Sequence, residues 1–298
     1  MYRIQLTLLL LTLFAPLMAR AIDLQPNDIV APAPNKNYLT LSYLNTENTT
    51  LYKNGSAVSA TPYASPAIDA QTAVLRGART YSLGELPAVT YIQLPYGTIR
   101  PAGSLANFSG DTGVGDLTVA TAIWPYHNRA TRTYLGLAGY LTSPTGNYSS
   151  QRVFNVSENR FRTDLQLGFQ SPITDSIDGM IAVDTMWFGG NSQCGVLCTG
   201  TTTTASLTQK PLTTTQFGPI YRINDIFTVG ASYIYVAGGA TAINNSYQGN
   251  VANTQRFLLS SQAHTPIGRI SLQYGRDMEI KNGFAQTRLL TLRLMKDF

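Results

Sequence analysis

The reactive side chains of this chain are few, and its two cysteines are the first to consider. Cys194 and Cys198 are separated by three residues in a threonine-rich stretch, with no histidine or acidic residue close by. A zinc site would need more ligands than these two thiolates. In an oxidising compartment such a pair is typical of a disulfide that staples a loop. The sequence therefore predicts a disulfide here, and neither a metal site nor a cofactor.

Charged side chains recur at alternate positions in the stretch RFRTDLQLGFQS, residues 160–171. Its odd positions are mostly apolar and its even positions are polar or small, and a period of two places each set on one face of a β-strand. In a soluble sandwich the apolar face would be the core. In an outer-membrane barrel it would meet lipid, and the polar face would line a lumen.

The N-terminal residues 1–21 are predicted to be a signal peptide that is removed on export. Arg3 supplies the positive charge, the next stretch is apolar, and Ala19 and Ala21 fit a small-x-small cleavage site. The processed chain would then start near Ile22, with an uncleaved anchor as the alternative. Either way, the segment directs the protein out of the cytoplasm.

The composition narrows the class of protein further. Charged residues make up 12% of the chain, about half the usual share for a soluble globular protein. The formal net charge is +5, two units of which come from Arg3 and Arg20 in the predicted signal, and the basic residues are scattered. This excludes nucleic acid as an expected partner. No later stretch is apolar for 18 residues, so no helical membrane span is expected.

Twelve segments of about ten residues show strand-like alternation bounded by turn signals. Ten residues in a strand tilted near 45° cross a bilayer core. The twelve predicted strands are 36–46, 72–82, 88–98, 113–124, 132–143, 160–171, 177–188, 210–221, 225–237, 253–263, 267–278 and 286–298. Strand ends are uncertain by about 2–4 residues. A count of ten or fourteen strands also stays open.

The connections between these strands alternate between long and short. An up-and-down barrel in the outer membrane has short periplasmic turns and longer outer loops. With the N-terminus in the periplasm, every short turn falls on the periplasmic side. The sequence thus predicts an all-β, antiparallel up-and-down transmembrane barrel of about twelve strands in the outer membrane of a Gram-negative bacterium. Its parts are a signal peptide (1–21), a periplasmic N-terminal arm (22–35) and the barrel (36–298).

The C-terminal stretch TRLLTLRLMKDF ends in Phe298, and Leu290, Leu292 and Leu294 share its parity. A terminal aromatic residue on an apolar-alternating last strand is similar to the signal by which the barrel assembly machinery recognises its substrates. That machinery, outer-membrane lipid and a small-molecule solute are therefore the expected partners. The sequence does not predict an oligomeric state.

The alternation also sorts individual side chains between lipid and lumen. Phe161, Leu165, Leu167 and Phe169 are expected to face lipid. The set expected to line the lumen and to set its selectivity carries both signs of charge: Asp116, Thr118, Arg160, Arg162, Asp164, Gln166, Asp184, Arg269 and Arg293. These charges either create a transverse field that orients solutes or pair with one another and fill the interior.

Three consecutive stretches resemble a known family: GVGDLTVATAIWPY (113–126), LGLAGYLTSPTGNY (135–148) and NVSENRFRTDLQLGFQSPI (155–173). They are similar to the outer-membrane family of meta-pathway phenol degradation proteins. The match lies in a Gly-x-Gly-Asp strand start at Gly113, a Pro-Thr-Gly loop at Pro144, and an asparagine-rich return at Asn155. The resemblance implies a barrel that moves aromatic hydrocarbons or related small molecules, and it implies no catalytic residue. The Cys194/Cys198 loop is not part of this pattern.

The predicted function is passive diffusion of small solutes, aromatic or hydrophobic ones included, through a lumen lined by polar and charged side chains. The alternative is a non-conducting structural or surface-binding barrel that acts through its long outer loops. An enzyme is not expected, because His127 and His264 fall at the periplasmic turns, whereas barrel enzymes place a base at the outer end or membrane face. Whether the lumen is open or plugged, and which solute passes, stay open.

Overall fold

The computed structural model describes residues 23–59 and 64–298. The predicted signal peptide, residues 1–21, lies outside the described residues. Over the described part of the chain, no helix has the length and the apolar character needed to cross a membrane.

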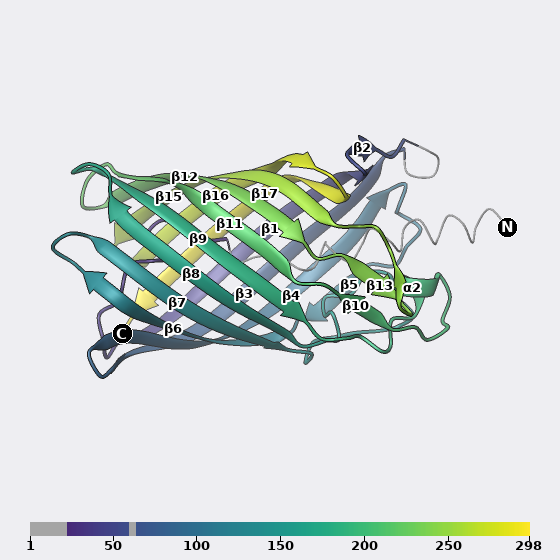
Figure 1. The fold of residues 1–298 in the computed structure, drawn as a ribbon, viewed down its shortest axis with the longest axis horizontal. Coiled ribbons are helices and arrows are strands. Elements are labelled where there is room, and N and C mark those ends of the chain that lie inside the picture. The colour runs from purple at the N-terminus through teal and green to yellow at the C-terminus, as the bar shows by residue number, and fades with distance from the viewer. Residues whose placement is uncertain (1–22, 60–63) are drawn as a thin grey trace.

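Twelve long antiparallel strands of the described chain form one closed barrel (Figure 1). Each strand pairs with its neighbours in the chain, and β17 pairs with β1 to close the sheet. The strands are β1 (Asn37–Lys53), β3 (Pro66–Leu83), β4 (Leu86–Gly103), β6 (Leu117–Asn128), β7 (Thr133–Ser143), β8 (Arg162–Pro172), β9 (Ile177–Phe188), β11 (Leu212–Arg222), β12 (Phe227–Gly238), β15 (Ala252–Thr265), β16 (Gly268–Ile280) and β17 (Gly283–Asp297). The predicted fold class and the twelve strands are confirmed.

Short turns lie at one end of the barrel and long connections at the other. The short-turn end also carries the first residue of β1, because Asn37 and Phe298 exchange backbone hydrogen bonds of 3.0 and 3.2 Å. The far end carries β2 (Ser56–Ala57), β5 (Asp111–Val114), a small sheet of β10 (Leu207–Gln209), β13 (Thr241–Ile243) and β14 (Ser246–Tyr247), and α2 (Val196–Thr199). We call the two ends periplasmic and outer, following the short-turn rule for such barrels.

The strands β1, β3 and β4 are longer than predicted, with 17 or 18 residues each. Their extra residues lie at the outer end, where they hold buried apolar side chains such as Leu51, Ile68 and Ile99. The alternation rule found only the central part of each strand, because beyond the bilayer the outer face need not be apolar.

The two faces of the wall differ as the alternation predicts. On β8, Phe161 before the strand and Leu165, Leu167 and Phe169 within it are exposed on the outer face, while Asp164, Gln166 and Gln170 are buried inside. The neighbouring strand β9 repeats this pattern, with Ile181 and Val183 outside and Asp184 inside. A closed barrel with an apolar exterior and a polar interior is of the outer-membrane transmembrane type.

Replacing Leu167 by arginine should destabilise the barrel by about 2–4 kcal/mol, because the charge would lie in the apolar band near its midplane. The free energy of unfolding in phospholipid vesicles, measured by guanidinium titration, checks this. Ile173→Arg is the matched control: Ile173 is 67% exposed in the β8–β9 turn, where the cost should be about 0–1 kcal/mol. Equal losses in the two variants would contradict the assigned lipid-facing position.

Candidate functional site

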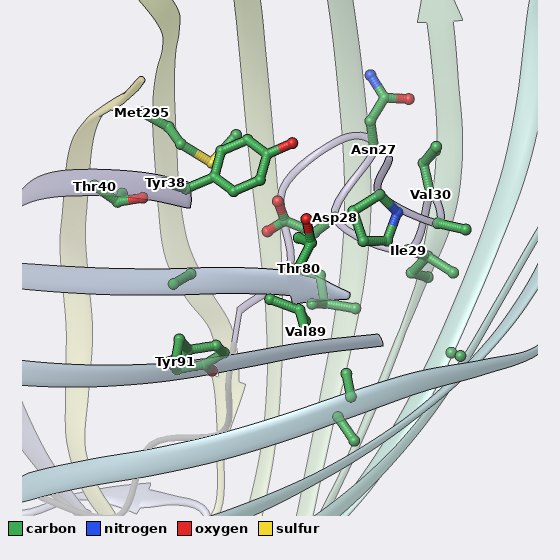
Figure 2. Close-up of a pocket in the computed structure, with 18 of the residues that line it drawn as sticks. Asn27, Asp28, Ile29, Val30, Tyr38, Thr40, Thr80, Val89, Tyr91 and Met295 are labelled. Atoms are coloured by element: carbon green, nitrogen blue, oxygen red, sulfur yellow. The ribbon is translucent and has the colours of Figure 1, made fainter. Parts of the chain in front are cut away.

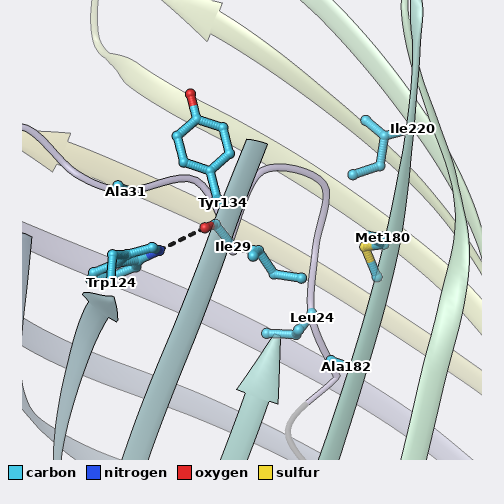
Figure 3. Packing of buried hydrophobic residues seen from close by; sticks show 8 residues of the cluster. All are labelled: Leu24, Ile29, Ala31, Trp124, Tyr134, Met180, Ala182 and Ile220. Carbon is cyan, nitrogen blue, oxygen red and sulfur yellow. Dashed lines mark hydrogen bonds between the residues drawn. The ribbon is translucent and has the colours of Figure 1, made fainter. Parts of the chain in front are cut away.

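The N-terminal residues 23–35, here called the plug, lie inside the lumen at its periplasmic half. Leu24, Ile29 and Ala31 are buried there. They pack against side chains on the inner wall (Figure 3): Trp124, Tyr134, Met180, Ala182 and Ile220. The indole Nε1 of Trp124 donates a 2.7 Å hydrogen bond to the carbonyl of Ile29. The sequence predicts a periplasmic arm for residues 22–35, whereas the described residues 23–35 enter the lumen.

Glutamine and asparagine side chains satisfy the polar groups of the plug. Gln216 both accepts a 2.9 Å hydrogen bond from the Leu24 amide and donates one of 2.9 Å to the Leu24 carbonyl. Gln273 donates to the same carbonyl, and Asn27 donates to Gln262. Because a buried backbone group without a partner is costly, these long neutral side chains let an irregular segment lie inside the barrel.

An acidic residue at the tip of the plug turn faces two arginines of the last two strands. Asp28 pairs with Arg293 of β17 at 3.0 Å and lies 3.8 Å from Arg269 of β16. Its carboxylate also accepts a hydrogen bond from the Gln25 amide, which closes the turn. Arg269 and Arg293, both predicted to line the lumen, are therefore engaged in holding the plug.

A cavity of about 450 Å³ lies between the plug and the wall (Figure 2). Figure 2 shows Tyr38, Tyr91 and Met295 on the wall, with the plug loop on the other side of the space. Apolar side chains such as Val89, Ala122 and Trp124 line much of it, and Arg76 projects over the Tyr91 ring, 4.3 Å from its centroid. This volume is in the range of small-molecule pockets.

The outer mouth is covered by residues 144–159 of the connection between β7 and β8, here called the lid. Phe154 at its centre is 2% exposed. It belongs to a cluster with Leu51 of β1, Ile68 of β3 and Phe284 of β17. None of these strands neighbours β7 or β8 in the sheet, so the lid crosses the mouth of the barrel.

Asp116 anchors the lid and does not line an open lumen. Its carboxylate accepts hydrogen bonds from the Gly146 amide, the Ser157 hydroxyl and the Glu158 amide, at 2.6 to 3.1 Å. A Cβ on Gly146 would collide with the backbone of Gly115. The Gly-x-Gly-Asp and Pro-Thr-Gly stretches therefore pack against each other, and the glycines permit the close approach.

Arg160 and Arg162 are likewise held by the lid. Both guanidinium groups pair with the carboxylate of Glu158, at 2.6 and 2.7 Å. Arg160 also donates to Gln209 and stacks on the Phe188 ring, 4.6 Å from its centroid. Burial alone would raise the pKa of Glu158, but Arg162 and Arg160 lower it below its ordinary value of 4.5.

Cys194 and Cys198 form the predicted disulfide. It joins Cys194 to Cys198 within α2, and the Val196 amide donates a 2.7 Å hydrogen bond to the carbonyl of Ser150 in the lid. Val196 and Leu197 pack on the Phe154 cluster. The stapled loop thus rests on the lid and adds a second layer to the closed outer end.

The remaining predicted lumen residues lie on the inner wall between lid and plug. Thr118 shares a hydrogen bond with Thr142 of the next strand, and Gln166 accepts one from the Tyr140 hydroxyl. Asp164 and Asp184 are each 4% exposed. The structure therefore divides the predicted set into three groups: lid anchors, plug anchors and mid-wall residues.

The sequence does not single out the glutamines that bind the plug, nor Tyr91, Trp124 and Arg256, which lies 3.9 Å from Asp23 of the plug. A glutamine on a polar strand face gives no sign in the sequence of what it contacts. One signal was available: the leader DLQPNDIVAPAP alternates apolar residues with turn formers, which is unusual for a solvated arm. Within the described residues, no group of three or more metal-binding side chains comes together.

Comparison with known proteins agrees with this architecture. The family model described as "Putative MetA-pathway of phenol degradation" matches residues 49–294. The chain belongs to this family. The resemblance stated from residues 113–173 is therefore confirmed, and it extends over most of the barrel. A search of curated proteins finds no match.

Solved structures of other barrels are similar to this chain. An outer membrane channel from Pseudomonas putida F1 superposes with a TM-score of 0.85 at 24% identity, over 93% of this chain and 100% of that one. The β domain of the Bordetella autotransporter BrkA gives a TM-score of 0.50 at 10% identity, over 86% and 98%. At these identities the likeness concerns the fold.

Replacing Asp28 by asparagine should loosen the plug. Two largely buried guanidinium groups would lose their counter-ion, and breaking a buried pair in this way costs about 3–5 kcal/mol. In a Val30→Cys background, maleimide labelling of the introduced thiol should become about tenfold faster, as expected when a shielded thiol is released. Asp225→Asn in an exposed turn is the matched control and should leave the rate unchanged. Unchanged labelling in Asp28→Asn would show that the plug does not depend on this pair.

The lid should loosen in acid, because the lowered pKa of Glu158 favours its charged form in the folded state. That stabilisation is complete well above pH 4.5 and is lost as the pH falls through the lowered pKa. Amide hydrogen exchange of residues 149–159, corrected for intrinsic rates, should therefore show less protection at acid pH than at pH 7. Glu158→Gln should abolish this difference, and Glu85→Gln, in an exposed turn, should preserve it. A lid equally protected at both pH values would refute the role of Glu158.

Proposed function

We propose that this protein is a passive outer-membrane channel for small solutes of aromatic or hydrophobic character. The observation that carries the proposal is the 450 Å³ cavity beside the plug, with its tyrosine, tryptophan and aliphatic lining. A small apolar solute would fill such a space, and the few polar groups would orient it. A wide, water-filled path of the kind found in large porins would not require this aromatic and aliphatic lining.

The names of related proteins support the same proposed function. The similar barrel from Pseudomonas putida F1 is called an outer membrane channel, and the family description concerns phenol degradation. We infer that the solute class includes small aromatic molecules. Its members would descend a concentration gradient, so no cofactor or energy source is required.

In this proposal the predicted selectivity residues have different roles. Arg269 and Arg293 secure the plug, and Arg160 and Arg162 secure the lid, so these four act as gating residues. Asp164, Gln166 and Asp184 face the lumen between the two closures and are the candidates for contact with a solute. Movement of the plug and of the lid would precede passage.

A second function, a non-conducting structural or surface-binding barrel, is favoured by one specific observation. Both ends of the lumen are filled, by the plug with its buried Ile29 and by the lid with its buried Phe154. The small sheet of β10, β13 and β14 adds an ordered outer surface. Conductance and solute entry distinguish this reading from the channel.

Single-channel recording in planar bilayers tests the channel. Removing the Phe154 ring deletes the centre of the lid cluster, a change that costs about 3–5 kcal/mol in a well-packed core. Phe154→Ala and Asp28→Asn should each increase the mean conductance, and the double variant should do so by several-fold. Phe161→Ala is the matched control, since Phe161 is 56% exposed on the outer face, and it should behave like the unmutated protein.

Entry of the hydrophobic fluorophore 1-N-phenylnaphthylamine into intact cells tests the solute class. Cells producing the protein should take up the dye faster than cells without it, and those with the double variant faster still. If no variant conducts ions in planar bilayers and dye entry is unchanged, the channel proposal is overturned. The structural barrel then remains as the function.

A further inference from the structure

Two carboxylates face the lumen between the plug and the lid. Asp164 of β8 and Asp184 of β9 are each 4% exposed. Within the described part of the chain, both carboxylate oxygens of Asp164 and the Oδ1 atom of Asp184 lack a hydrogen-bond partner. A buried, ionised carboxylate is costly unless something pairs with it. A positively charged ligand would supply such a partner.

The strand register brings these two groups together. Gln166 lies opposite Asp184, and Asp164 is two residues away on the same inner face. Such diagonal neighbours are about 7–8 Å apart and their Cβ atoms are somewhat closer, so one small cation could lie between their carboxylates. Asp184 is also within electrostatic range of Asp164 and of Asp23 at the start of the plug.

Two arginines near these carboxylates hydrogen-bond to other acids, although the charge of Arg162 also acts on Asp164. Arg162 pairs with Glu158 at 2.7 Å, and Arg256 pairs with Asp277 at 2.8 Å while lying 3.9 Å from Asp23. Among the described residues, the acids of this region therefore outnumber its arginines, and Asp164 accepts no hydrogen bond from any of them.

The surroundings favour an organic cation over a metal ion. In the sheet, Asp164 is flanked by Tyr140 on β7 and by Met186 on β9. The Tyr140 ring packs edge-on against Tyr91, with centroids 6.2 Å apart. Aromatic and thioether groups suit the carbon atoms and the charge of an alkylammonium group, whereas they do not ligate hard metal ions.

We propose that Asp164 and Asp184 form a binding site for a primary ammonium group. Two sources carry this chemistry. One is the α-amino group that processing near Ile22 would create, because the adjacent Asp23 is within electrostatic range of Asp184. The other is a free amine, which would reach the site from the cavity beside the plug, because that cavity extends to Tyr140 and Gln166 on the same inner face. The site does not depend on the proposed channel function, since a barrel that does not conduct would bind the ammonium group equally well.

The test uses the processed, detergent-solubilised full chain with two readouts. Calorimetry measures binding of benzylammonium, with benzyl alcohol as the uncharged probe of the same shape. Mass spectrometry measures the rate at which limiting acetic anhydride acetylates the α-amino group. Both are compared between the unmutated protein, the isosteric variant Asp164→Asn/Asp184→Asn, and Asp69→Asn, which alters an exposed carboxylate.

Each source predicts a different result. If a free amine is the ligand, benzylammonium should bind about tenfold more weakly to the double variant, with no change for benzyl alcohol. If the α-amino group occupies the site, its acetylation should be about tenfold faster in the double variant, because its protonated form is no longer favoured. Asp69→Asn should match the unmutated protein in both.

The proposal is overturned if neither readout differs between the double variant and the unmutated protein. If the double variant does not migrate as a folded barrel in unheated gels, the proposal is tested on the unmutated protein alone. That protein must then either bind benzylammonium in preference to benzyl alcohol, or protect its α-amino group relative to the same chain in urea. Failure of both comparisons would equally exclude the site.

Discussion

The hydrogen bonds between β1 and β17 are the interaction on which the rest of this structure depends. A sheet with a free edge would expose unpaired backbone groups to hydrocarbon, so a membrane barrel must be closed. Closure fixes the register from Tyr38 to Tyr52 against β17. With the register fixed, the parity of every strand decides which side chains meet lipid and which enclose the lumen.

Closure with twelve strands also creates a problem of space. The interior of an eight-stranded barrel can be filled by wall side chains, whereas wider barrels hold a channel or added segments. Here the plug and the lid occupy the two ends. The wall supports the plug with neutral amides such as Gln216. Asp28 of the plug and Glu158 of the lid each face two arginines. The proposed gates and the proposed ammonium site both follow from this division of the interior.

The sequence predicted what depends on local pattern. The period-two alternation on 160–171 identified β8 and its two faces, and the spacing of cysteines identified the disulfide. It did not predict the partners of Arg160 or Arg293, because parity places a side chain inside without saying what it meets there. The plug was missed for a related reason. Its contacts with Gln216 and Gln273 join residues more than 190 positions apart, and no local rule connects them.

The contact between the plug and the last two strands has a consequence for biogenesis. The plug is synthesised before the barrel strands, yet Asp28 is held by Arg293, 265 residues later in the chain. It can therefore take its final place only after the C-terminal strands have arrived. Because β1 follows the plug directly and pairs with β17, seating of the plug and sealing of the barrel become parts of one late event. An incomplete chain would lack both and would be distinguishable from a finished one by its unburied N-terminus.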